Sequence, residues 1–278
     1  PRAGGFNVPI AKEIWQDLPI NAPAEPQKGK IYAVLVGIDE YGEKLENKRF
    51  NGCVNDVTVW KRHLNDLFHT ETNFSLINAD ATKNTIIDTL KNVLNVAQTE
   101  DTILFTFSGH ANNKQQPHSL ATYDTDSTHA QSYLSETEFK ALITQTNAQN
   151  PFIVVILDTH SGSSGWIDIN NEKHILLAAT ASREISLEID KRGLFTSLLQ
   201  DTIFNSTFQN ALVNNSHLSV SYCRLIKKVF ARIKEMGHKQ TPQLFGHPKA
   251  INQAFLGGST SQATYINELL HECNYENI

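Results

Sequence analysis

Two short apolar segments, about fifty residues apart in the chain, constrain the fold of this protein most strongly. Residues 102–107 and 152–157 are rich in β-branched and aromatic side chains, and such runs are typical of buried β-strands. The first leads into Ser-Gly-His at 108–110, and the second leads into Asp-Thr-His-Ser-Gly at 158–162. Because ligands bind at the carboxyl ends of the strands in an open parallel sheet, the sequence predicts a site built from these two strand ends.

The rest of the chain alternates predicted strands with predicted helices. Further apolar segments indicate strands at 31–38, 74–78, 174–180 and, near the end, 254–256. Helical spacing of apolar residues and capping residues indicate helices at about 54–67, 82–97 and 135–146, from 193 onward, and at 217–236 with Gly237 after it. This alternation predicts an α/β fold with a mostly parallel sheet, right-handed crossovers and helices on both faces.

The chain divides into three parts by composition. In residues 1–29 a regular helix is prevented by the prolines Pro1, Pro9, Pro19, Pro23 and Pro26, so we expect a leader or linker there. Residues 30–258 carry the alternating pattern and are long enough to bury one substantial core. Within them the polar segment 111–134 is too long for a simple connection. Residues 259–278 are expected to form a tail or the start of another domain.

Charge and cysteine content narrow the classes of partner. The formal net charge of −5 argues against nucleic acid, since phosphate binding needs a basic face. No apolar run approaches the roughly 20 residues that span a bilayer, and no secretory leader is seen at the start, so we expect no membrane partner. Cys53, Cys223 and Cys273 show neither a disulfide framework nor metal-ligand spacing. These features predict a protein of the reducing cytoplasm.

The two strand ends resemble those of the caspase–metacaspase family of cysteine proteases. In that family the first strand ends in Ser-Gly-His-Gly, whose His is the general base, and the second ends in Asp-x-Cys-His-Ser-Gly, whose Cys is the nucleophile. A His-to-Cys separation of about 50 residues is also found in caspases. The resemblance covers roughly residues 30–258. It implies a caspase-like three-layer α/β/α sandwich with a mostly parallel sheet of about six strands, and a cysteine endopeptidase acting on proteins or peptides.

The chain departs from the family motif at the nucleophile itself. Asp158 and Thr159 are followed directly by His160, so the motif is one residue short and lacks its cysteine. A cysteine between Thr159 and His160 could be chemically modified, as reactive thiolates often are, and so be missing from a sequence of standard residues. The gene could instead lack it, leaving a catalytically dead scaffold that binds a partner, or Thr159 could have replaced it beside a deletion. Because every flanking motif residue is kept, we favour the first explanation.

The resemblance also implies roles for the neighbouring residues. His110 would be the base that takes the thiol proton and passes it on, which suits an imidazole with a pKa near 6.5. The backbone N–H of Ala111, where the family usually has Gly, would be one oxyanion donor, and the nucleophile's own N–H would be the second. His160 would be structural rather than the base.

Two carboxylates are expected to decide substrate specificity. Residues 52–56, Gly-Cys-Val-Asn-Asp, resemble the metacaspase motif Gly-Cys-x-Asn-Asp. The resemblance places Asp56 and Asp158 in the S1 pocket, where they would match a substrate Arg or Lys. Asp56 could alternatively only stabilise a helix N-terminus, and Arg49 and Arg183 could imitate the arginines with which caspases bind Asp. Charge complementarity favours cleavage after Arg or Lys.

Several further residues are candidates for supporting roles. Ser186, at the centre of 184–188, would pair with the substrate backbone by β-addition. Cys53 begins a helix, which can activate a thiol, but a buried thiol is the favoured interpretation. Asp124 and Asp126 could bind calcium, although two acids are too few for such a site, so we expect no metal and no cofactor.

Maturation and regulation are only suggested by the sequence. The link 163–173, where family members are cut, holds one basic residue, Lys173, and Lys191-Arg192 offers another candidate cleavage point. Regulatory domains or partner proteins are possible.

Overall fold

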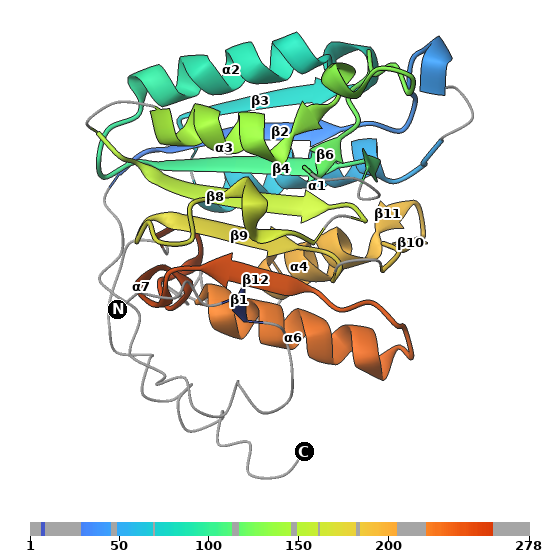
Figure 1. Cartoon of the computed structure of the whole chain (residues 1–278). Coiled ribbons are helices and arrows are strands. Elements are labelled where there is room, and N and C mark those ends of the chain that lie inside the picture. The colour runs from blue at the N-terminus through green and yellow to red at the C-terminus, as the bar shows by residue number, and fades with distance from the viewer. Residues whose placement is uncertain are drawn as a thin grey trace.

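A single twisted sheet forms the centre of the computed structural model (Figure 1). The structure describes residues 7–8, 29–45, 49–68, 70–112, 117–145, 149–160, 162–181, 184–204 and 221–257. The strands of the sheet lie in the order β1-β12-β9-β8-β4-β2-β3. Their bounds are β1 Asn7–Val8, β2 Ile31–Gly37, β3 Thr72–Ile77, β4 Thr102–Ser108, β8 Phe152–Asp158, β9 His174–Ala178 and β12 Gln243–Gly246. Only β12 and the two-residue β1 pair antiparallel, so the predicted mostly parallel sheet is confirmed.

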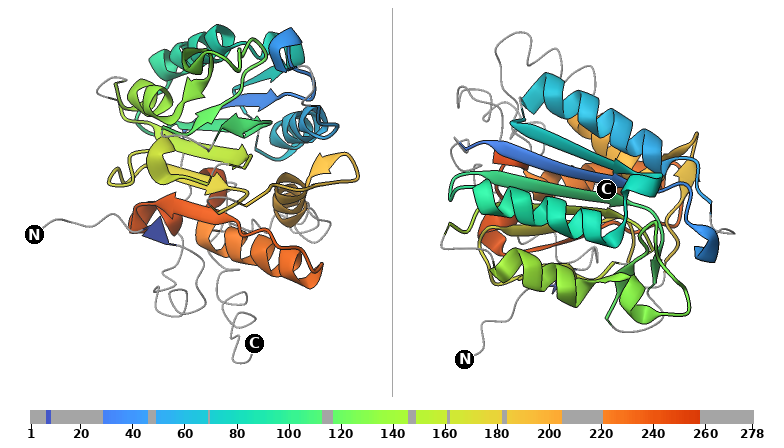
Figure 2. Two further views of the ribbon diagram at one scale, coloured as in Figure 1. Left: turned by 45° about the vertical axis from the view of Figure 1, so that its right-hand side comes forward. Right: turned by 90° about the horizontal axis from the view of Figure 1, so that it is seen from above.

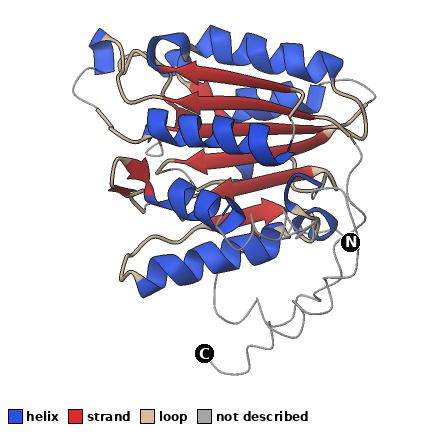
Figure 3. Cartoon of the chain, turned by 180° about the vertical axis from the view of Figure 1, so that it is seen from behind, coloured by secondary structure: helices blue, strands red, loops and turns tan. Residues whose placement is uncertain are grey.

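Helices cover both faces of this sheet, as Figures 2 and 3 show. One apolar core includes side chains of α1 (Cys53–His63), α4 (Leu194–Phe204), α6 (Tyr222–Glu235) and α7 (Pro248–Ile251). The other core includes side chains of α2 (Lys83–Val96) and α3 (Glu136–Gln145). The predicted three-layer α/β/α arrangement is therefore confirmed. Among the described residues, no helix is both long enough and apolar enough to cross a membrane.

The apolar strands form because each of them is covered on both sides. Successive side chains of β2 alternate between the cores: Ala33 and Leu35 belong to one, and Val34 and Val36 belong to the other. Alternate side chains of a strand point to opposite faces, and a parallel strand buried on both faces therefore needs an almost continuous apolar run. This requirement explains why the sequence located the inner strands well.

Most predicted helix boundaries agree with the structure. The side chain of Thr82 caps α2 by accepting a hydrogen bond from the Thr85 backbone N–H. A different helix, α6, is followed by Gly237 with a φ of 78°, as expected for the residue after a helix. The helix expected from about 217 begins at Tyr222, and residues 217–220 lie outside the described part of the chain.

The predicted strand at 254–256 is wrong. Ala254 makes only an isolated bridge to Ser221, and Phe255–Gly257 is a short 3₁₀ turn. Leu256 has a φ of 49°, and its N–H donates to the Tyr222 hydroxyl. The strand that takes this place in the sheet is β12. Its four residues were not recognised, because so short a run carries almost no periodic signal.

Two small sheets complete the edge of the main sheet where β4 and β8 end. The segment after β4 folds into β5 (Ala111–Asn112), β6 (Ser119–Leu120) and β7 (Leu134–Ser135), which accounts for its unusual length. The second small sheet is the hairpin of β10 (Glu188–Ile189) and β11 (Arg192–Gly193). The remaining described helices are single turns at Glu43–Leu45, Leu64–Phe68, Asn78–Asp80, Ala130–Ser132 and Ser164–Trp166.

The terminal parts of the chain are mostly outside the description. Of the expected leader 1–29, the structure describes Asn7 and Val8, which pair with Phe245 and Leu244 as the edge strand β1, together with residue 29. The expected tail 259–278 lies outside the described residues.

Candidate active site

The two strand ends singled out in the sequence lie side by side. In the parallel register of β4 and β8, Ser108 is the partner of Asp158. The Gly109 N–H donates to the Asp158 carbonyl at 3.3 Å, which continues the pairing one residue past β4. The polar residues after both strands therefore emerge at the same edge of the sheet, as predicted for an open parallel sheet.

His110 is fixed at this edge by its backbone and by two aromatic rings. Its N–H donates to the Tyr41 hydroxyl at 2.7 Å, and its carbonyl accepts from Ala121 N at 2.9 Å. The imidazole packs against Phe50 and Tyr41, with ring centroids 4.1 and 5.2 Å away. Burial raises the pKa of Tyr41 well above its ordinary value, so the phenol remains neutral. Neither aromatic was identified from the sequence, because both lie in irregular segments without periodicity.

His160 lies opposite His110 across the edge. The two ring centroids are 6.5 Å apart and the planes are nearly perpendicular, at 67°. The Nδ1 atom of His160 accepts a hydrogen bond from the Ser186 N–H at 2.8 Å. In the chain as it stands, the side chain that β8 presents to His110 is therefore an imidazole, at the point where the family motif has a thiol.

The other two predicted catalytic residues have different surroundings. Thr159 is fully buried, and its carbonyl accepts a hydrogen bond from the Thr180 hydroxyl at 3.0 Å. It is not among the residues that line the cavity described below. Ala111 is half-buried in β5 and pairs with Leu120 of β6.

One cavity connects the strand ends with the start of α1 and with the β10–β11 hairpin. Its walls include Asp56, Asp158, His160, Ser186 and Gly193. The structure thus brings together the three predicted substrate-binding residues, Asp56, Asp158 and Ser186, from three separate segments of the chain. The side chain of Ser186 donates to Asp158 Oδ1, so in this state Ser186 contacts both the carboxylate and the His160 ring.

The two carboxylates of the cavity are almost completely buried. Asp56 on α1 is 1% exposed and Asp158 at the end of β8 is 7% exposed. Asp158 Oδ2 accepts from the N–H and hydroxyl of Thr196 at 3.0 and 2.8 Å. Asp56 Oδ2 accepts from Gly193 N at 3.2 Å, whereas Asp56 Oδ1 accepts no hydrogen bond from the described residues. The pair therefore offers carboxylate oxygens to the cavity, and one of them, Asp56 Oδ1, lacks a hydrogen-bond donor among the described residues.

Burial disfavours the charged form of both acids. Burial raises the pKa of Asp56 well above its ordinary value, and the neighbouring Asp158 raises it further. Burial also raises the pKa of Asp158, against the hydrogen bonds from Ser186 and Thr196. Two carboxylates held this close attract a cation, because a cation restores the free energy lost on removing them from water.

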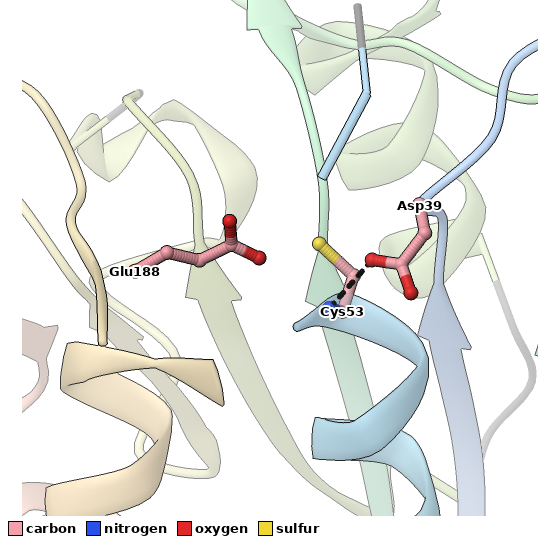
Figure 4. A group of neighbouring side chains, drawn as sticks. All are labelled: Asp39, Cys53 and Glu188. Atoms are coloured by element: carbon pink, nitrogen blue, oxygen red, sulfur yellow. Dashed lines mark hydrogen bonds between the residues drawn. The ribbon is translucent and has the colours of Figure 1, made fainter. Parts of the chain in front are cut away.

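Cys53 borders the same cavity, and it has acidic neighbours (Figure 4). Asp39 accepts from the backbone N–H of Cys53 at 2.8 Å and caps the start of α1. Ligand-capable atoms of Asp39, Cys53 and Glu188 lie within 4.8 Å of one another, as no other such group does among the described residues. Burial, then Asp39, raises the pKa of the Cys53 thiol well above its usual range. The thiol is therefore protonated at neutral pH, which does not suit a nucleophile.

Asp124 and Asp126, the two acids considered for calcium, accept hydrogen bonds from residues near them. Asp124 Oδ1 accepts from Lys83 N at 2.8 Å and from the Thr122 hydroxyl. Asp126 Oδ1 accepts from the N–H and hydroxyl of Thr128. Both carboxylates thus hold the connection around β6 and β7, rather than converging on a shared point.

The basic residues considered for specificity or processing lie in different places. Lys173 donates to the carbonyls of Thr99 and Asn150, which precede β4 and β8 at the opposite end of the strands. Lys191 and Arg192 lie in the β10–β11 hairpin beside the cavity. Arg183 is outside the described residues.

Comparison with known proteins agrees with this architecture. Residues 32–169, just under half of the chain, match the family model for the metacaspase, peptidase C14 domain. A structural-genomics protein from Geobacter sulfurreducens superposes with a TM-score of 0.59 at 16% identity, covering 85% of this chain and 96% of the other. Caspase-1 from Spodoptera frugiperda superposes with a TM-score of 0.58 at 12% identity, covering 87% and 96%. No match was found among curated protein sequences. At these identities the likeness to solved structures concerns the fold.

Proposed function

We propose that this chain, which has a caspase/metacaspase-like fold and matches a metacaspase peptidase domain, is a cysteine endopeptidase that cleaves proteins after arginine or lysine. One observation supports this most directly. A histidine at the end of β4 and two buried carboxylates, Asp56 and Asp158, meet at the edge of the sheet where β4 and β8 end. A base and an anionic pocket at one sheet edge are what hydrolysis beside a basic side chain requires.

The proposed nucleophile is a cysteine between Thr159 and His160. His110 takes the thiol proton, and the thiolate attacks the carbonyl carbon of the scissile bond. The N–H of Ala111 and that of the nucleophile donate to the tetrahedral oxyanion. His110 then protonates the leaving amine, and a water molecule, deprotonated by His110, releases the acyl group from the sulfur. The aromatic contacts of Tyr41 and Phe50 support this role, because they fix the imidazole.

The P1 side chain binds, in this proposal, between Asp56 and Asp158. Within the described part of the chain, Oδ1 of Asp56 accepts no hydrogen bond, and Oδ1 of Asp158 accepts one from the Ser186 hydroxyl. A guanidinium or ammonium group entering the cavity would satisfy the first and displace Ser186 from the second. Ser186, freed in this way, lies where it can hydrogen-bond an extended substrate backbone.

Intact mass of the protein, together with the DNA sequence across Thr159–His160, tests the nucleophile. We expect the gene to encode a cysteine there and the mass to exceed that of the printed sequence by a cysteine or a modified cysteine. A gene that encodes Thr159 followed directly by His160 would contradict the hydrolytic proposal. The pairing of His160 with His110 would then favour a binding scaffold that retains the anionic cavity.

Fluorogenic peptides that differ only at P1 test the specificity. We expect the order Arg or Lys far above Asp. Preferential cleavage after Asp would contradict the assignment of the cavity to a basic side chain.

The reaction as proposed needs no metal ion. A free thiolate requires a reducing compartment, so we place the protein in the cytoplasm, where localisation of a tagged chain can test it.

A further inference from the structure

We propose that the dipeptide Arg192-Gly193 of β11 is a positioning element that sets the spacing and the charge of the Asp56–Asp158 pair. This inference rests on the proposed pocket for a basic side chain. It concerns residues that contact the pocket from the β10–β11 hairpin. The sequence considered Arg192 only as a possible cleavage point and gave Gly193 no role in the site.

Gly193 lies directly against both carboxylates. Its N–H donates to Asp56 Oδ2 at 3.2 Å. A Cβ atom built on Gly193 would stand 2.2 Å from Asp158 Oδ2 and 2.9 Å from Asp56 Oδ2. Both distances are shorter than a real carbon–oxygen contact, and the obstructing atoms belong to short side chains that are themselves buried. Glycine at this position therefore allows the two acids to converge on one point of the backbone.

Arg192 supplies the positive charge next to Asp56. Its Nε atom lies 3.9 Å from Asp56 Oδ1, and its side chain is 26% exposed. The guanidinium donates to Gln200 Oε1 and lies 3.7 Å from Asp201 Oδ1. Gln200 in turn donates to the Asp56 carbonyl at 3.0 Å. Arg192 is thus held by α4 in a fixed position behind the pocket.

The charges around Asp56 come from every element packed against it. Burial and Asp158 on β8 disfavour its ionised form. Cys53 on α1 and Glu188 on β10 line the same cavity, and the acids around Cys53 keep its thiol protonated. The Ser108 hydroxyl and the Gly193 N–H favour the ionised form. The positive charge of Arg192 also favours the ionised form. When Asp56 and Asp158 are both ionised, the Arg192 guanidinium leaves one net negative charge on this group of three, which complements a single basic P1 side chain.

Hydrogen bonds connect the hairpin that carries Arg192 to α1 and to the segment before it, and they keep the hairpin in place beside Asp56. The Asn55 side chain donates to the Lys191 carbonyl at 2.9 Å, and Glu188 Oε1 accepts from Asn51 N at 2.9 Å. These bonds make β11 a fixed wall of the pocket, and they hold Arg192 as an internal partner of Asp56 rather than as a cleavage point.

Equilibrium binding of Nα-acetyl-argininamide, followed by calorimetry from about pH 5 to about pH 9, tests this inference on the protein as isolated. Affinity for argininamide should rise with pH as Asp56 loses its proton. We expect Arg192→Gln to move this rise to higher pH, because Asp56 without the neighbouring positive charge keeps its proton to a higher pH. Arg192→Lys should restore the original curve, and Lys191→Gln, one residue away on the exposed turn, should leave it unchanged. We expect Gly193→Ala to weaken binding about tenfold or more at every pH.

The outcomes separate this inference from the proposed function. If the parent protein binds and Arg192→Gln shows the parental pH curve, or a loss of equal size at every pH, the positioning role is overturned. If the parent does not bind argininamide at any pH, the basic pocket itself is wrong, and this inference fails with it. Circular dichroism establishes whether Gly193→Ala is folded, and if it is not, the Arg192 series alone decides.

Discussion

Asp56 is a carboxylate held in a place where burial opposes its charge. Its raised pKa means that the folded chain binds the proton of this acid more tightly than the unfolded chain does. The contribution of Asp56 to stability is therefore most favourable below its ordinary pKa and is lost as the pH rises through the folded value. A residue that costs stability at neutral pH is expected to be retained for binding rather than for folding.

Replacing Asp56 by Asn should therefore separate stability from function. We expect Asp56→Asn to increase the free energy of unfolding at pH 7 by about 1 kcal/mol, because the amide oxygen can still accept from Gly193 N without a charge. Urea unfolding at pH 7 and pH 4 measures this, and the gain should shrink at the lower pH. Cleavage of Arg substrates should fall at the same time. A variant that is less stable at pH 7 and equally active would contradict both roles.

His110 is expected to act in the reaction rather than in folding. His110→Ala should lower kcat/KM for an Arg peptide by about 10²–10⁴-fold. Argininamide binding should be largely retained, because Asp56 and Asp158 line the cavity and His110 is not among its lining residues. The matched control is His129→Ala, whose imidazole is exposed beside Asp126. Activity that survives in His110→Ala would contradict its assignment as the base.

At the scale of elements, the β10–β11 hairpin joins the pocket to the rest of the chain. Asp190 and Lys191 at its turn have φ values of 51° and 59°, the left-handed values that two-residue hairpins of type I′ require. Residues with a Cβ adopt this conformation at a cost of roughly 1–2 kcal/mol. The hairpin therefore keeps a less favourable turn sequence than Asn-Gly would provide.

Lys191→Gly is expected to stabilise this turn. The free energy of unfolding should rise by up to about 1 kcal/mol, somewhat offset by the greater freedom of glycine in the unfolded chain. Thermal unfolding measures the change, and Gly237→Ala, at a φ of 78° after α6, should change in the opposite direction. A loss of stability in Lys191→Gly would show that the lysine side chain makes contributions beyond the turn.

At the scale of the whole molecule, the proposed reaction uses no bound ion. We expect extensive dialysis against EDTA to leave cleavage of an Arg peptide unchanged. Thermal unfolding with and without EDTA provides a second readout that does not depend on activity. If calcium restores activity lost in EDTA, the proposal of a metal-independent enzyme is wrong. Asn variants of Asp124, Asp126, Asp39 and Glu188 would then locate the ion.

Much of this architecture could be predicted from the sequence because it depends on local pattern. The inner strands, the stripe of α2 and the glycine after α6 each leave a signal within one segment. The wrong strand at 254–256 and the missed β12 share a cause: a run of three or four residues is too short to show a period. The site residues were located by their motifs, but Tyr41, Phe50, Gln200 and Arg192 were not, since their roles arise only from contacts across the chain.

By itself, the sequence determined the α/β layering, the two strand ends and the presence of His110, Asp56 and Asp158 as chemically capable groups. The periodicity of apolar residues and the polar residues after each strand are local patterns of the sequence, so they can be deduced without the structure. Only the tertiary structure decided that His160 lies opposite His110, and that a glycine and an arginine from a distant hairpin press against two buried acids. Such contacts join residues that are up to 137 positions apart, and no local pattern can specify the electrostatic environment they create.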